Sequence, residues 1–227
     1  MTRKSIARPL STKQQAKTFY DDANAIYLRL HSDALNLLNE LDLIYGSKKK
    51  TIKQKWMAKS YIKIATQLAR QSLHVFNTEE NFFLLACLGC RSLIEHEINA
   101  KYVFFHPKHH GDMEWTSNLA KDYWRITRVR SANKAKLGGV SIYRRAKDIR
   151  KLSTYKRNFS HLTGITHGTA NSVLLIKDEH LYDGVAWIGL HSVVLLNNVI
   201  DYIAKFHKIE RDMSIEDDIR ELVTLYR

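Results

Sequence analysis

The chain has 227 residues, of which 44% are hydrophobic and 26% are charged, and this composition excludes a disordered protein. The length allows one sizeable core. The formal net charge is +13, which favours a phosphate-rich partner, although a basic surface that only keeps the protein soluble is the simpler alternative. The two cysteines exclude a disulfide scaffold and fit a reducing compartment, so we expect a cytoplasmic protein.

The N-terminal residues 1–17 predict a flexible basic arm, because they hold five Lys and Arg and no acid. They lack the apolar core of a signal peptide. Residues 18–227 predict one helical domain, since Gly and Pro are scarce and no low-complexity linker divides the chain. The most apolar stretch, residues 185–206, is interrupted by polar side chains, so no membrane span is expected.

Three long helices are predicted in the first half of the chain. Apolar residues at spacings of three and four predict the first over residues 19–41, ended by Gly46, and the second over residues 56–76. The third covers about residues 80–105. Its first part, FFLLACLGC, is apolar all round, so we expect this part to be central in a helical bundle.

The second half of the chain predicts further helices and one irregular region. The helices are expected over residues 113–130, 142–151, 154–162 and 185–207, and Gly138–Gly139 is the strongest internal break. A β-branched run at residues 173–176 is compatible with a short strand. Ser214 followed by Asp217 predicts the capped start of a last short helix. The whole pattern predicts an all-α bundle of long helices with an irregular basic insertion.

The segment 125–157 carries most of the excess positive charge. It has twelve Lys and Arg and a single acid, Asp148. Phosphate contacts supply much of the affinity of proteins for nucleic acids, so this segment predicts such a partner. The residues that we expect to bind nucleic acid are Arg125, Arg128, Arg130, Arg144, Arg145, Lys147, Arg150, Lys151 and Lys156.

A polar stripe follows the apolar part of the third predicted helix. Arg91, Glu95 and Asn99 are four residues apart, and Tyr102 follows after three more, so all four share one helical face. We expect this face to line a groove or a partly buried site, where an Arg–Glu pair needs compensating partners. The alternative is an ordinary salt bridge on a solvent-exposed face.

A second polar cluster lies at residues 155–169, with the sequence YKRNFSHLTGITHGT. Arg157 and His161 are four residues apart and can meet on one helical face, and His167 follows beyond a glycine. An arginine can hold a phosphodiester and stabilise developing charge, and an imidazole can take the proton of a ribose 2′-hydroxyl. The alternative is a surface that binds phosphate without chemistry.

No motif in the chain requires a metal or an organic cofactor, and none is expected. His106, His109, His110 and Asp112 form a loop rich in possible ligands, but their spacing matches no specific metal site. The CLGC sequence of the third helix has no second cysteine pair to complete a zinc site, so we interpret its cysteines as small residues that let helices approach closely.

Taken together, the two polar clusters resemble the HEPN superfamily (higher eukaryotes and prokaryotes nucleotide-binding). The resemblance rests on RSLIEHEINAKYVFF and on YKRNFSHLTGITHGT, and it covers about residues 60–205. It points to an uncharacterised bacterial branch with an Arg–x3–Glu helix, followed later by an aromatic residue, a Ser or Thr, and a His–Gly pair. Phe159, Thr163 and His167–Gly168 fill these later places.

The resemblance implies an all-α bundle, frequently a homodimer, in which many members cleave RNA without a metal. Their usual signature is an arginine, four to six residues, and then a histidine. Here three residues separate Arg157 from His161 and nine separate Arg157 from His167, whereas four separate Lys156 from His161. Members that only bind nucleic acid or a partner protein also occur in the superfamily.

These patterns support the hypothesis of a metal-independent endoribonuclease, a toxin-like or antiviral-defence effector. Arg157 would bind the scissile phosphate, His161 or His167 would act as general base, and Arg91 and Glu95 would orient the site. The expected partners are RNA or another nucleic acid, a second copy of the chain, and a neutralising or regulatory protein. The alternatives are a non-catalytic nucleic-acid-binding module and a structural subunit that docks an acidic protein.

Overall fold

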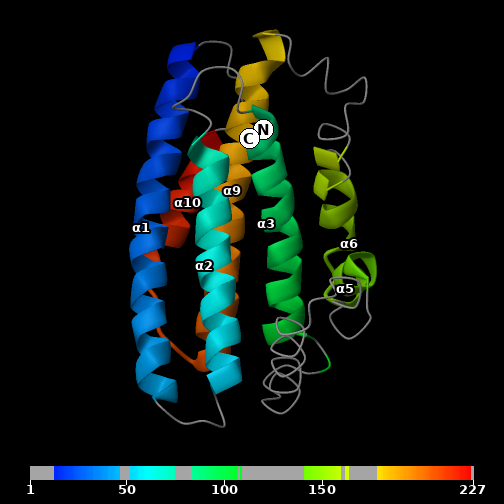
Figure 1. Ribbon diagram of the computed structural model, residues 1–227. Helices are drawn as coiled ribbons and strands as arrows, with labels where there is room; N and C mark the ends of the chain where they lie inside the picture. Colours follow the sequence, from blue (N-terminus) through cyan, green and yellow to red (C-terminus); the bar gives the residue numbers. More distant parts are fainter. Residues whose placement is uncertain are drawn as a thin grey trace, which may run out of the picture.

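The computed structural model describes residues 13–46, 52–74, 83–106, 108, 141–159, 162–163 and 178–225. These residues form an all-α fold, as predicted, and no strand occurs among them. Four long helices run side by side (Figure 1). They are α1 (Lys13–Tyr45), α2 (Ile52–His74), α3 (Phe83–Phe104) and α9 (Asp178–His207).

Helix α9 packs against the three other long helices and against α10 (Ser214–Leu225). Its apolar residues face inward: Val193, Leu196 and Ile203 are fully buried. Within the described ranges, its segment Ala186–His207 is the one stretch long and apolar enough to cross a membrane, and most of that stretch is buried inside the bundle. Such burial is typical of a core helix.

Helix α1 begins earlier than the sequence predicts. Its first residue is Lys13, and Ala16 is already buried, so residues 13–17 belong to the bundle rather than to the basic arm. Residues 1–12 of that predicted arm lie outside the described residues. At the other end of the helix, Gly46 has a φ of +50°, a left-handed conformation that glycine adopts without strain.

The apolar part of α3 is buried on one side only. Cys87 and Cys90 are fully buried free thiols, and burial raises the pKa of both, as expected for small residues in a helix contact. Leu85 and Leu88, however, are 55% and 44% exposed. The predicted central segment is therefore buried at Ala86, Cys87 and Cys90 and exposed at Leu85 and Leu88. Helices α2 and α9 both pack against α3, and Arg91, further along α3, contacts Phe159.

Helices α2 and α3 approach closely at Gly89. A Cβ at this position would lie 2.8 Å from the Oγ of Ser72, which donates a hydrogen bond of 2.9 Å to the carbonyl of Leu68. Further along α3, the Nε2 of His96 donates to the carbonyl of Tyr61 at 2.8 Å. The absence of a side chain at position 89 therefore sets the distance between the two helices.

A ring cluster closes the far end of the bundle. The imidazole of His207 lies against the rings of Tyr45, Phe104 and Phe206, and its Nδ1 shares a hydrogen bond of 3.2 Å with the hydroxyl of Tyr45. Burial lowers the pKa of His207 to about 4, and it lowers the pKa of His96 to about 4 as well. Both histidines are therefore neutral in the native protein near pH 7.

Charged side chains tie the start of α10 to the bundle. Arg211 has a side chain that is 5% exposed, and it pairs with Asp33 of α1. The cap of α10 differs from the prediction. The carboxylate of Asp212 accepts a hydrogen bond of 2.9 Å from the Ser214 N–H, while the Ser214 hydroxyl accepts one from Arg29. Asp212, and not Ser214, thus supplies the capping acceptor.

A small outer layer lies along α3, on the side away from α1 (Figure 1). It consists of α5 (Ile142–Asp148), α6 (Leu152–Thr154) and the π-helical turn η5 (Tyr155–Phe159). The two short helices predicted in this region are thus confirmed, the second one with a π-helical part. The predicted helix at residues 113–130, the break at Gly138–Gly139 and the strand at residues 173–176 lie outside the described residues.

We expect Gly89→Ala to lower the free energy of unfolding by about 1–3 kcal/mol, because the added methyl group overpacks the contact with Ser72. Ser72→Ala removes the clashing Oγ, so the double variant should lose less than the sum of the two single losses. Urea denaturation followed by circular dichroism measures all three. Losses that simply add would contradict the close approach.

Stability should also depend on pH through the buried histidines. Because burial holds the pKa of His96 and His207 near 4, below the ordinary value of 6.5, the unfolded chain takes up protons first on acidification. The contribution of these two histidines to the free energy of unfolding is therefore fully present above about pH 6.5, and it is lost as the pH falls toward 4. His207→Phe should reduce the loss between pH 7 and pH 5 by about 1–2 kcal/mol. Urea titrations at both pH values measure this, and an undiminished loss would contradict a neutral, buried His207.

Candidate nucleic-acid interface

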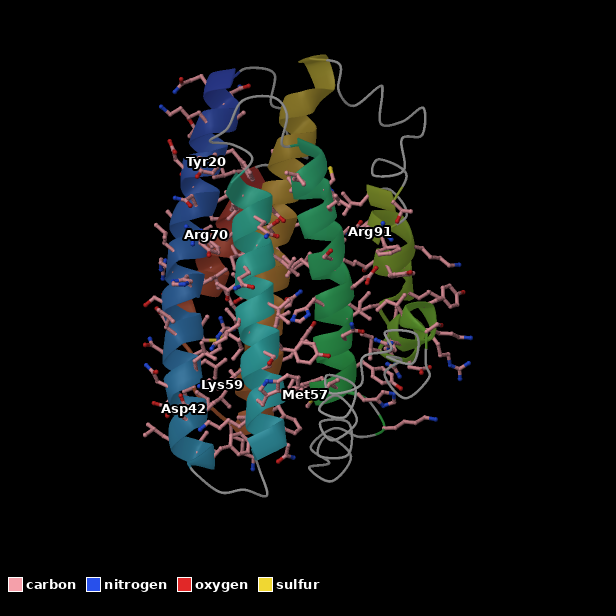
Figure 2. The ribbon with its side chains drawn as sticks, in the orientation of Figure 1. Tyr20, Asp42, Met57, Lys59, Arg70 and Arg91 are labelled. Atoms are coloured by element: carbon pink, nitrogen blue, oxygen red, sulfur yellow. The ribbon has the colours of Figure 1, made fainter. Side chains whose placement is uncertain are left out.

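The polar stripe of α3 faces the outer layer. In Figure 2, Arg91 lies between α3 and this layer. Its guanidinium carbon is 4.7 Å from the centre of the Phe159 ring, and Phe159 in turn stacks on Tyr155 with ring centres 4.6 Å apart. A cation over an aromatic face is electrostatically favourable, so Arg91 helps to fix η5 on α3.

Glu95 lies in the same interface, between charges from two elements. Burial raises the pKa of its carboxyl, and the charges of Arg91 and Arg145 lower it. The carboxylate in turn raises the pKa of the Tyr155 phenol, after the larger effect of burial. Since the side chains of the stripe are half-buried, the stripe lines a partly buried site and not an open solvent face.

Arg145 of α5 binds the stripe from the other side. It is 8% exposed, and its Nη1 donates to the Oδ1 of Asn99. Its charge also lowers the pKa of Tyr102, which burial and Asp148 raise. Arg145 therefore holds α5 on α3 and is not the exposed phosphate ligand expected from the sequence. The expectation failed because the charge run does not show which of two successive arginines faces inward.

A second internal charge cluster surrounds Glu97. This carboxylate is 2% exposed and accepts hydrogen bonds from the Nζ of Lys151, from the hydroxyl of Tyr202 at 2.8 Å and from Nδ2 of Asn198 at 3.4 Å. Lys101 lies beside it, with a pKa lowered by burial and by the charge of Lys151. Lys151 is thus the counterion of Glu97 and not a free phosphate ligand. Like Arg145, it differs here from the nucleic-acid-binding role expected from the sequence.

Glu97 was not expected from the sequence, although one signal pointed to it. It lies at the spacing of the buried residues Cys90, Leu93 and Ile94, where an amphipathic helix should carry apolar side chains. A carboxylate on a core-facing position requires a partner inside the protein. The sequence pattern predicted a site only on the neighbouring face, which carries Arg91 and Glu95.

Arg157 lies in the middle of η5 and is exposed. Its Nε donates to the Oδ1 of Asn158 at 3.2 Å, and Asn158 is buried. Two successive residues of the π-helical turn thus differ in burial, with Asn158 inside and Arg157 outside. Turns of this kind occur frequently at functional sites, and this one presents a guanidinium to solvent at the edge of the stripe.

A histidine outside the two predicted clusters, His191 of α9, feels the charge of Arg157. Burial lowers the pKa of His191 most, the hydrogen bond to Trp187 raises it, and Arg157 lowers it. The Nδ1 atom is 2.8 Å from the Trp187 carbonyl, so the neutral ring donates there and keeps Nε2 as an acceptor. In the sequence, His191 shows only as an interruption of an apolar helix.

The remaining predicted site residues fall into two groups. His161, His167, Arg125, Arg128 and Arg130 lie outside the described residues. Arg144, Lys147, Arg150, Lys156 and Arg157 are exposed on the outer layer, and Arg144 pairs with Asp148 at 3.2 Å.

In the loop that is rich in possible metal ligands, His106 is buried and its Nδ1 accepts a hydrogen bond from the backbone of Lys108. His109, His110 and Asp112 lie outside the described residues. Among the residues whose placement is described, no group of three His, Cys, Asp or Glu side chains could hold a metal ion.

Comparisons with known proteins found no match to this chain among family models, curated proteins or solved structures. A function is therefore inferred from the residues of the site and their geometry.

We expect Glu97→Gln to lower the free energy of unfolding by about 1–3 kcal/mol, because Lys151 and Tyr202 lose a charged acceptor. Lys151→Met should cost a similar amount, and the double variant less than the sum, since neither charge is then left unpaired. Glu95→Gln on the same helix is the matched control, with a smaller loss. Equilibrium unfolding in urea measures these values, and strict additivity of the first pair would contradict the proposed pairing.

Proposed function

We propose that this protein binds RNA on the exposed face of its outer layer and cleaves it without a metal ion. The observation that carries the proposal is the contact between two segments far apart in the sequence. Arg91 of the α3 stripe lies on Phe159, two residues from the exposed Arg157. A half-buried carboxylate, Glu95, lies beside Arg91 and Tyr155. The exposed guanidinium of Arg157 suits the binding and polarisation of a phosphodiester, and Arg91 and Glu95 support the turn that carries it.

In the proposed reaction, Arg157 binds the scissile phosphate and stabilises its developing charge. A neutral histidine takes the proton of the ribose 2′-hydroxyl, the 2′ oxygen bonds to phosphorus, and the bond to the 5′ oxygen breaks. The leaving oxygen takes a proton from water, the histidine returns its proton to solvent, and the products carry a 2′,3′-cyclic phosphate and a 5′-hydroxyl. His161 and His167 are the candidates for the base, and His191 is a third because its Nε2 is an acceptor. Arg91 and Glu95 position η5.

The wider assignment is part of the same proposal. The all-α bundle and the placement of an Arg–x3–Glu helix against η5 support a HEPN-like protein. A homodimer, a cytoplasmic location, a neutralising or regulatory partner protein, and a toxin-like or antiviral-defence role accord with this proposal.

A non-catalytic nucleic-acid-binding module is the second candidate. The exposed cations Lys147, Arg150 and Lys156 favour it, because they could hold a phosphate backbone without help from any histidine.

The test is incubation of the purified protein with total bacterial RNA in EDTA. We expect cleavage that Arg157→Ala reduces about a hundredfold or more, and that one of His161→Ala, His167→Ala or His191→Ala abolishes. Arg70→Ala, on the exposed part of α2, is the matched control and should cleave like the wild type. Analysis of the product ends should find 2′,3′-cyclic phosphates.

Other outcomes separate the alternatives. Intact RNA that still shifts on a gel would favour the binding module. RNA that is neither cleaved nor shifted at low salt would favour a subunit that docks an acidic protein.

A further inference from the structure

An exposed aromatic ring lies among the free cations of the outer layer. Tyr143 is 45% exposed. Lys147 follows it four residues later, so these two exposed side chains share the solvent face of α5. Arg150 is exposed just past the end of the helix. The opposite face of this helix holds the buried Arg145 and Ala146.

Lys156 of η5 joins the same surface. Its Nζ lies 5.7 Å from the centre of the Tyr143 ring, so the faces of α5 and η5 are continuous here. The acid of α5, Asp148, pairs with Arg144. In the described part of the chain, no carboxylate pairs with Lys147, Arg150 or Lys156. Three cations are therefore available to an anionic ligand around one aromatic ring.

The backbone at Arg150 is an outlier. Its φ is +59°, in the left-handed region where glycine is preferred. The turn is a normal helix ending: the N–H of Arg150 donates to the carbonyl of Lys147, and the N–H of Lys151 donates to that of Ala146. A large side chain is disfavoured in this conformation, and here it is an exposed cation directly after α5.

The chemistry of this face fits a single strand. An unpaired base can stack on an aromatic ring while flanking cations bind its phosphates, whereas a duplex buries its base faces. We propose that Tyr143 stacks an unpaired RNA base and that Lys147, Arg150 and Lys156 bind the adjoining phosphates, so that this face selects single strands. The subsite rests on the proposed function and adds affinity for the RNA that Arg157 acts on.

The test is fluorescence anisotropy with the full chain and 2′-O-methyl RNA, which lacks the attacking hydroxyl and stays intact. The wild type should bind a single-stranded oligonucleotide at least about tenfold more tightly than a duplex of the same length. Tyr143→Ala and Tyr143→Leu should lose about tenfold for the single strand and little for the duplex. Tyr143→Phe should keep the affinity, because it keeps the ring.

Arg150 is tested against a matched residue. Lys208 ends α9 in the same conformation, with a φ of +56°. Glycine should be accommodated at both positions without loss of stability. Arg150→Gly should weaken binding of the single strand and reduce the salt dependence of its affinity by about one phosphate contact. Lys208→Gly should leave both unchanged.

The outcomes distinguish the two proposals. A single-strand preference that survives Tyr143→Ala would overturn the stacking subsite, and so would equal affinity of the wild type for strand and duplex. Cleavage of total RNA in EDTA would still stand in either case. If the wild type bound neither RNA and cleaved none, the subsite and the proposed function would fail together.

Discussion

The buried carboxylate of Glu97 is the constraint on which the candidate site depends. It lies on the core side of α3, where a charge is costly unless it is paired. Tyr202 supplies a hydrogen bond from α9, and Lys151 supplies the compensating charge from the connection between α5 and α6. One carboxylate thus joins two helices of the bundle to the outer layer. Because Lys151 is held there, η5 begins at a fixed place beside the α3 stripe.

This constraint divides the basic residues of the outer layer into two kinds. Arg145 and Lys151 face inward and hold the layer to α3 through Asn99 and Glu97. The exposed cations around Tyr143 remain available to a ligand. The excess charge of this segment therefore does two different things. Part of it replaces the apolar contacts that a seven-residue helix cannot supply, and the rest forms the face that we assign to RNA.

The long helices could be predicted from the sequence because each repeats its apolar spacing over many turns. The α3 stripe could be predicted as well, since Arg91, Glu95 and Asn99 lie at helical spacing on a long helix. The buried face of α5 could not be predicted, because a helix of seven residues with four charges shows no apolar periodicity. For the same reason, the inward direction of Arg145 was missed. The exposure of Leu85 and Leu88 was missed because composition does not show where a covering layer begins.

The π-helical turn explains how a site can form on so small a layer. In an ordinary α-helix, residues four apart share a face, which is the basis for pairing Arg157 with His161 in the sequence. A π-helical turn has a wider phase, and within η5 Asn158 is buried while Arg157 is exposed. The spacing rule for an arginine and a histidine on one helical face assumes a regular α-helix, and η5 is not one. The charge of Arg157 also lowers the pKa of His191, although α9 is far from η5 in the sequence. The count of residues between arginine and histidine therefore does not by itself exclude a histidine from the proposed site.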